Sequence, residues 1–174
     1  MMKTLLFPAL LASLLVLSGC GGSETKSTPA STEPAAPPAA TPPADPAGVK
    51  VIRLTGDDTM RFNLTTIEAA PGEPMRVELK NIGRMPKQTM AHNFLLLQPM
   101  SDADLNAIGN AASMAAPTYL PKDMSKVLAH TPKLVGPGET TTVDFNAPTE
   151  PGEYPYLCTF PGHFATMRGK LIVK

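Results

Sequence analysis

Residues 158–167 read Cys-Thr-Phe-Pro-Gly-His-Phe-Ala-Thr-Met and bring a thiol, an imidazole and a thioether into one short stretch. A thiolate, two imidazoles and a weak axial thioether are the ligands of a blue-copper electron-transfer site, because soft sulfur donors select copper over hard cations. The Pro-Gly pair at the centre predicts a turn that folds His163 and Met167 back toward Cys158. The stretch therefore predicts three ligands of one copper ion and leaves a second histidine to be found.

The second imidazole must come from His92 or His130, the two histidines outside this stretch. His92 begins the most apolar segment of the chain, residues 92–97, where a buried imidazole would need a partner. His130 lies between a short predicted strand and a turn. The residues favour His92 as the ligand. The alternatives are that His130 is the ligand and that His92 is a core histidine satisfied by hydrogen bonds.

Short runs of alternating apolar and polar residues, separated by Gly and Pro, extend from residue 49 onward. This pattern is typical of an all-β fold, and roughly 125 residues are enough for one sandwich with a continuous core. We predict a β-sandwich of seven or eight strands. The candidate strands are residues 49–54, 63–69, 75–81, 92–98, 126–129, 140–146, 153–158 and 170–174.

One segment between these strands has a helical pattern instead. Ser101 can cap a helix, with Asp104 three residues further on. We predict a single short helix outside the sheets, with an apolar face formed by Leu105, Ile108, Ala112 and Ala115.

The N-terminus has the pattern of an export signal followed by a tether. Residues 1–19 combine a positive start, an apolar stretch and a small-residue exit, and they are too short to span a bilayer. Their ending resembles a bacterial lipoprotein box, which predicts cleavage before Cys20 and its acylation; an ordinary cleaved signal is the alternative. Residues 20–48 are rich in Pro, Ala, Thr and Ser and predict a disordered tether. Residues 49–174 are then the copper domain.

Charge and cysteine content limit the function further. The 15 Lys and Arg residues balance 15 Asp and Glu residues, so no strong field exists to recruit nucleic acid. If Cys20 carries lipid, Cys158 has no intramolecular partner in an oxidising compartment, because the chain has two cysteines. Such a thiol is open to oxidation or mispairing unless it is buried or bound to metal.

The domain resembles the azurins, bacterial members of the cupredoxin family of blue-copper proteins, over most of residues 51–174. Residues 158–167 are similar to the azurin ligand loop, with its spacing of four and then three intervening residues. Residues 85–93 are similar to the family's first-histidine segment, whereas residues 129–131 match a stretch whose histidine is not a ligand. The resemblance implies a Greek-key sandwich and agrees with the choice of His92.

This resemblance implies a single type 1 copper ion held by four side chains and one carbonyl. His92 and His163 would bind through Nδ1 in one plane with the Cys158 thiolate. The Met167 sulfur would lie further away on one side, and the Ala91 carbonyl would approach from the other.

The resemblance also assigns roles to residues around the ligands. Asn93 would tie its strand to the loop near Thr159. Backbone N–H groups around Asn93 and Phe160 would point at the sulfur, contacts that tune the potential and hold the geometry.

The electron is expected to leave through the imidazole edge of His163, within an apolar docking patch that suits transient redox partners. This docking patch consists of Met60, Met90, Phe160, Pro161 and Ala165. For Met60, a core-filling role is the alternative. We predict a monomer in the periplasm, anchored by lipid, with the outer membrane favoured because Gly21 lacks acidic character.

Several features depart from the azurin pattern. The cysteine count excludes the usual disulfide. Ala91 stands where the family commonly has Gly, and Phe94 takes the place of a buried Trp. Asn81 replaces a histidine whose protonation accompanies redox change in some relatives, so we expect no histidine-based pH switch there.

Two other classes of function compete with electron transfer. A copper-binding or delivery module would need an exposed, exchangeable site, whereas a thiolate in a closed loop favours retention. An enzyme could use Cys158 and His163 as a nucleophilic pair, but Met167 and the second histidine would then have no role. A multicopper enzyme would need more histidines than the spare His130. We predict an electron carrier and no enzyme, with delivery as the alternative.

Overall fold

The computed structural model describes residues 45–174, which form eight strands and two helices. All eight predicted strands are present. The strands are β1 (Lys50–Gly56), β2 (Thr66–Ala69), β3 (Pro74–Asn81), β4 (Leu95–Leu97), β5 (Val127–His130), β6 (Thr140–Asn146), β7 (Gly152–Leu157) and β8 (Arg168–Val173), and the helices are α1 (Lys87–Met90) and α2 (Asp102–Ser113).

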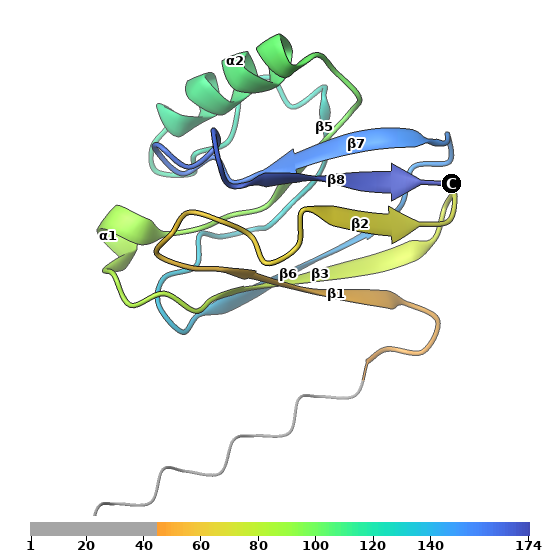
Figure 1. The fold of residues 1–174 in the computed structure, drawn as a ribbon, viewed down its shortest axis with the longest axis horizontal. Helices are drawn as coiled ribbons and strands as arrows, with labels where there is room; N and C mark the ends of the chain where they lie inside the picture. The colour runs from red at the N-terminus through yellow and green to blue at the C-terminus, as the bar shows by residue number, and fades with distance from the viewer. Residues whose placement is uncertain (1–44) are drawn as a thin grey trace, which may run out of the picture. The chain divides into compact units, whose positions relative to one another are not determined.

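The strands form two sheets that pack face to face, with α2 outside the larger sheet (Figure 1). The smaller sheet has the order β1-β3-β6, and the larger has the order β2-β8-β7-β4-β5. The pairs β1-β3 and β2-β8 are parallel, and the other neighbours are antiparallel. The structure confirms the predicted all-β sandwich with an external helix.

Alternating burial along the strands produces the core between the sheets. In β3, Met75, Val77 and Leu79 are buried and alternate with more exposed residues. Burial of one such side chain contributes about 1.5–3 kcal/mol. The largest fully buried side chains are Tyr156 and Phe94, whose ring centroids lie 5.4 Å apart. The Phe94 ring is therefore part of the core between the two sheets.

Helix α2 begins as the sequence predicts. The Ser101 hydroxyl accepts a hydrogen bond from the Asp104 backbone N–H at 3.2 Å, which caps the first turn. Leu105 and Ala112 are buried against the larger sheet, while Ile108 and Ala115 are half-buried. Leu105 joins a second apolar cluster, outside the main core, with Leu95, Leu97 and Leu157.

The structure shortens two of the predicted strands, and β2 begins at Thr66 rather than at residue 63. The strand predicted over residues 92–98 is shortened to β4, because His92 instead forms an isolated bridge with Val135. A helix of one turn, α1, precedes it and was not predicted, since four residues are too few to carry a helical period.

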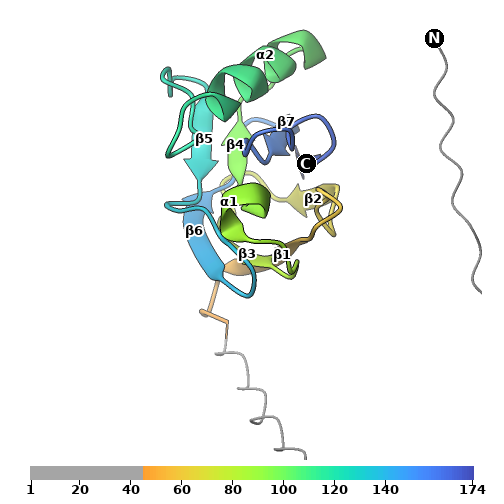
Figure 2. The same cartoon turned by 90° about the vertical axis from the view of Figure 1, so that its left-hand side faces the viewer.

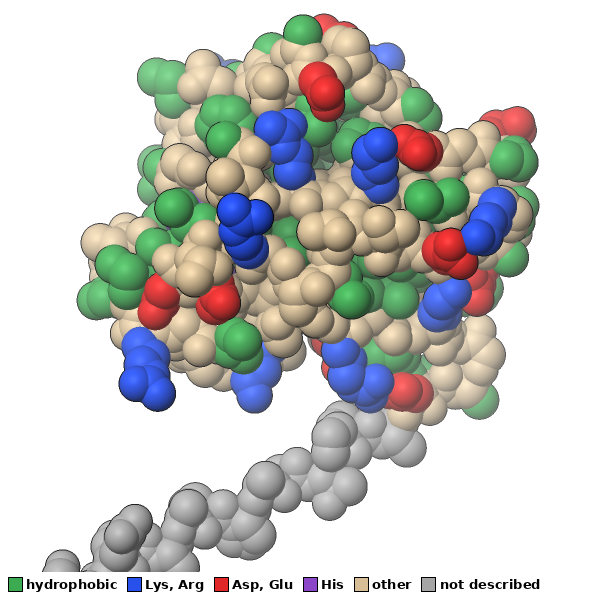
Figure 3. Space-filling model, in the orientation of Figure 1, with side chains coloured by type: hydrophobic (Ala, Val, Ile, Leu, Met, Phe, Trp, Pro, Cys, Tyr) green, Lys and Arg blue, Asp and Glu red, His purple; other side chains and the backbone are tan. Residues whose placement is uncertain are grey.

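The predicted signal, the lipidation site at Cys20 and most of the predicted tether lie outside the described residues. Asp45, inside the predicted tether, pairs with Arg53 of β1. Within residues 45–174, no helix has the length and apolar character needed to cross a membrane. Acidic and basic side chains are interspersed on the face seen in Figure 3.

Candidate metal centre

The sheet topology brings two distant segments of the chain to one end of the sandwich. β4 and β7 are antiparallel, and Leu95 pairs with Leu157. The residues before β4 therefore lie beside those that follow β7, which include Cys158. The connection from β7 to β8, residues 158–167, is called the ligand loop below; Figure 2 looks onto this end, where α1 also lies.

Backbone hydrogen bonds determine the shape of the ligand loop. The Cys158 N–H donates to the Met167 carbonyl at 2.9 Å, which continues the β7-β8 ladder to the neck of the loop. A turn then places His163, whose N–H donates to the Phe160 carbonyl at 3.0 Å. Gly162 has φ +82°, the left-handed conformation that such a Pro-Gly turn requires. The Met167 N–H donates back to the His163 carbonyl at 2.8 Å.

Three donor atoms meet inside this end of the molecule. His92 Nδ1 and His163 Nδ1 lie 3.3 Å apart, and Cys158 Sγ lies 3.6 Å from His163 Nδ1. All three side chains are buried, and possible ligand atoms of the three lie within 4.8 Å of one another. The structure therefore brings together three of the four predicted side-chain ligands around one point.

Met167 lies beside the same point. Its side chain is fully buried, and a Cβ atom added to Gly56 would overlap both the Met167 Cε and the His92 Cδ2. The thioether methyl and the imidazole therefore meet over this glycine. The absence of a side chain at Gly56 lets β1 approach the two residues closely.

Burial controls the protonation of the three donors. It raises the pKa of the Cys158 thiol to about 12, although backbone N–H groups of Asn93 and Phe160 oppose the shift. Burial, with the nearby His92, lowers the pKa of His163 to about 4. The pKa of His92 is also lowered, mainly by burial, against the opposing effect of the Asp57 backbone. In the metal-free protein at neutral pH, the site therefore holds a thiol and two neutral imidazoles.

Side chains around the donors join the two segments. Asn93 Nδ2 donates to Thr159 Oγ1, and the Thr159 N–H donates to Asn93 Oδ1, both at 2.8 Å.

The fully buried Asn81 donates from Nδ2 to the carbonyls of Met90 at 2.9 Å and Val135 at 3.1 Å. Sequence reasoning did not assign these bonds to Asn81; its position as the last residue of a strand gave no signal for them.

The backbone around His92 is fixed from the opposite side. His92 N–H donates to the Val135 carbonyl at 3.0 Å, and the Val135 N–H returns a bond to the His92 carbonyl at 2.9 Å. Ala91 is fully buried next to this bridge. His130, the alternative ligand, is half-buried at the end of β5, with Nδ1 3.1 Å from the Thr131 carbonyl. It is not part of the three-residue group.

Residues of the predicted docking patch differ in exposure. Pro161 and Ala165 are exposed, and Met60 is half-buried, whereas Met90 and Phe160 are buried. The Thr166 hydroxyl donates to the Met60 carbonyl at 3.1 Å, which ties the residue 60 segment to the ligand loop.

The sandwich and its buried sulfur and nitrogen donors define a protein built to hold one soft metal ion. Residues 49–174 match the family model described as copper binding proteins, plastocyanin/azurin family. The chain belongs to this family, and the resemblance seen in the ligand loop is confirmed.

Individual relatives agree with this assignment. An azurin of Pseudomonas aeruginosa is 37% identical over 128 residues, which cover 71% of this chain and 84% of that protein. Outer membrane protein H.8 of Neisseria meningitidis is 34% identical over 128 residues, covering 72% of this chain and 68% of that protein. The solved structure of auracyanin A, a "blue" copper protein of Chloroflexus aurantiacus, has a TM-score of 0.65 at 33% identity, and the match covers 73% of this chain and all of that one.

The donor set fits the metal of this family. Two neutral imidazole nitrogens 3.3 Å apart are poor partners for each other unless a proton or a cation lies between them. One thiol sulfur and two imidazole nitrogens, with a thioether beside them, are the donors that copper prefers. Copper is the cofactor of the protein, and His92, Cys158 and His163 provide a place for one ion.

Proposed function

We propose that the protein carries single electrons on one type 1 copper ion bound by His92, Cys158, His163 and Met167, with the Ala91 carbonyl as a weak additional ligand. The convergence of one sulfur and two Nδ1 atoms in a buried space supports this proposal most strongly. Bound copper supplies one-electron chemistry, because it is stable as Cu(II) and as Cu(I).

The protein's own residues keep the ligand positions nearly constant in both oxidation states. His92 is fixed by its backbone bridge to Val135, and Cys158 by the ladder bond to Met167. The Asn93-Thr159 pair links these two anchors. Because little has to move and water is excluded, the reorganisation on electron transfer is small.

Electrons enter and leave at the end of the sandwich that carries the ligand loop. The exposed residues Pro161 and Ala165 and the half-buried Met60 form the outer part of the docking patch, and Phe160 and Met90 lie beneath them. An apolar surface without strong charge suits redox partners that bind briefly and separate. The protein acts as a monomer in this proposal.

The chain is proposed to work in the periplasm, held by lipid on Cys20. One relative is named an outer membrane protein, which favours the outer membrane as the site of the anchor. More than one acyl chain gives a stable hold on a membrane. Replacement of Cys20 by Ser should move the protein from the membrane fraction to the soluble periplasmic fraction; continued membrane association would contradict the anchor.

Copper delivery is the second candidate, and the burial of the donors argues against it. An exchangeable site needs exposed ligands, whereas His92, Cys158 and His163 are at most 1% exposed. No catalytic role is proposed, since the family relatives are named as copper proteins of the azurin and auracyanin type. Loss of copper within minutes to a mild chelator would favour delivery instead.

The test uses the purified chain with Cys20→Ser, so that Cys158 is its single thiol. Added Cu(II) should give an intense visible thiolate-to-copper absorption that disappears on reduction and returns on oxidation. Cys158→Ser and His92→Ala should each abolish this band, and the matched control His130→Ala should keep it. A colourless wild-type protein, or a band that survives His92→Ala, would overturn the proposed site.

A further inference from the structure

Helix α2 contacts two residues, and each of them directly follows a ligand proposed in the ligand loop. Phe164 follows His163 and packs against Gly109 of α2. Arg168 follows Met167, and its Nη1 donates to Asn106 Oδ1 at 3.3 Å. Through these neighbouring residues, α2 is connected to His163 and Met167.

Gly109 provides the closer of the two contacts. A Cβ atom added there would lie 2.6 Å from Phe164 Cγ, 2.7 Å from Cδ2 and 2.9 Å from Cβ, distances that no side chain tolerates. Glycine is among the least favourable residues inside a helix, so its presence needs a structural reason. The reason here is the aromatic ring, which occupies the space that any other residue would fill.

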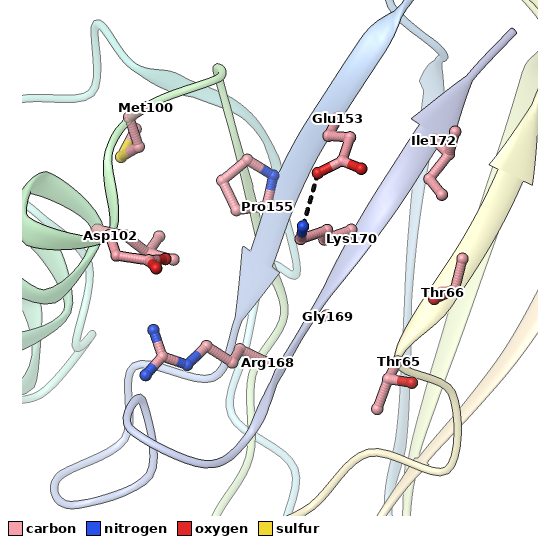
Figure 4. A pocket seen from close by; sticks show the side chains of 11 residues that line it. Thr65, Thr66, Met100, Asp102, Glu153, Pro155, Arg168, Gly169, Lys170 and Ile172 are labelled. Carbon is pink, nitrogen blue, oxygen red and sulfur yellow. Dashed lines mark hydrogen bonds and ion pairs between the residues drawn. The ribbon is translucent and has the colours of Figure 1, made fainter.

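Arg168 provides the second contact and spans a cleft. Its Nε donates to the Ala165 carbonyl at 3.1 Å, so the same side chain holds the loop backbone and α2 together. Figure 4 shows Arg168 extending from the start of β8 toward α2, where Asp102 also lines the cleft of about 660 Å³. The cleft separates α2 from β8 here, so Arg168 bridges a gap that packing leaves open.

The two contacts act on one face of the helix. Asn106 and Gly109 are three residues apart, which places them on neighbouring turns of the same face. Within the described residues, the tip of the ligand loop has few other external supports: the Thr166 hydroxyl donates to the Met60 carbonyl, and the Phe160 ring packs against Tyr119. A helix held firmly by its own apolar cluster can therefore stabilise the loop tip.

We propose that α2 is a brace for the ligand loop, with Gly109 and Asn106 as positioning residues for His163 and Met167. The part of the proposal that concerns copper depends on the proposed function. The brace itself is a property of the metal-free chain. Phe164 packed only as core filler is the competing explanation, since it also contacts the apolar cluster of Leu95, Leu97, Leu105 and Leu157.

The first test compares Gly109→Ala with the matched control Asn110→Ala, a neighbouring substitution at an exposed site of the same helix. In metal-free protein, amide hydrogen exchange of Thr166 and Met167 should become roughly tenfold faster in Gly109→Ala, because the displaced ring strains the loop turn. Asn110→Ala should leave these rates unchanged. Equal exchange in Gly109→Ala and wild type would overturn the brace.

A double substitution separates contact from general destabilisation. In a Phe164→Ala background, Gly109→Ala should have no further effect on exchange, because the ring it meets is gone. An equal effect in both backgrounds would contradict the proposal. With copper bound, Gly109→Ala should shift the visible band and the reduction potential, while Asn110→Ala shifts neither. A wild type without the band would refute the proposed function, whereas an unchanged Gly109→Ala spectrum in a blue wild type would refute only the brace.

Discussion

The two segments that supply the proposed ligands are held in different ways. Residues 90–93, the histidine segment, are fixed on several sides by hydrogen bonds to Asn81 of β3, to Val135 between β5 and β6, and to Thr159 at the start of the ligand loop. The ligand loop is fixed at its neck, but its tip depends on its own turns and on α2. The comparison teaches that one half of the site is set by hydrogen bonds to residues distant in sequence, and the other half mainly by local conformation.

The largest expected difference between the two segments concerns the proton that a ligand must release when copper binds. Copper binding must displace a proton from Cys158 in the ligand loop, whose thiol pKa is raised to about 12, whereas His92 and His163 are already neutral at pH 7. The apparent copper affinity should therefore rise about tenfold per pH unit, roughly a hundredfold from pH 6.5 to 8.5. Competition with a chelator of known pH dependence measures this, and a flat profile would mean that the thiol is already ionised.

The substitution Asn81→Leu removes hydrogen bonds that hold the histidine segment in place. This change removes the Nδ2 hydrogen bonds to the Met90 and Val135 carbonyls and the bond from the Gly83 N–H to Oδ1. The Met90 carbonyl and the Gly83 N–H lose these partners, which should cost about 2 kcal/mol in free energy of unfolding. Asn63→Leu is the matched control, because the Asn63 side chain also makes hydrogen bonds to the backbone, but at an exposed site. Urea unfolding of both metal-free variants gives the comparison; equal losses would show that burial of Asn81 is unimportant.

The ligand loop should make the metal-free protein sensitive to acid. An unfolded His163 binds a proton below about pH 6.5, but the folded one only below about pH 4, so the unfolded state binds more protons between these values. Stability should fall as the pH drops through this window, by about 1.4 kcal/mol for each pH unit. Denaturant unfolding at several pH values measures the slope, and His163→Gln should make it shallower. An unchanged slope in this variant would assign the effect to other groups.

The smallest effect separates stability from function. Gly162→Ala places a side chain at φ +82° in open space and should cost about 1 kcal/mol. Gly138→Ala is a matched control, with φ +74° and equally open surroundings in another turn. Both should lower the melting temperature by similar amounts, yet only Gly162→Ala should alter the copper spectrum. Altered spectra in both variants would remove the distinction between the two halves of the site.

Much of this architecture could be predicted because it depends on local pattern. The eight strands follow from alternation, the α2 start from Ser101, and the grouping of Cys158 with His163 from their spacing in one loop. The apolar surroundings of His92 favoured it over His130, and the resemblance agreed with this choice.

Other features depend on contacts between distant residues and leave little trace in the sequence. Helix α1 is too short to show a period. Asn81 has the appearance of an ordinary strand end, although its amide joins two backbone segments. In the sequence, Gly109 is simply an unfavourable residue inside a helix, and only the position of the Phe164 ring explains its presence.

The enclosure of Cys158 has a consequence before any metal arrives. A thiol with no exposed surface and a raised pKa contains little thiolate, which is the form that attacks disulfides and reacts with oxidants. The newly folded chain can therefore persist among oxidising agents without cross-linking to its neighbours. Synthesis and copper supply need not be synchronised, because the metal-free protein keeps the Cys158 thiol protonated and enclosed until copper binds.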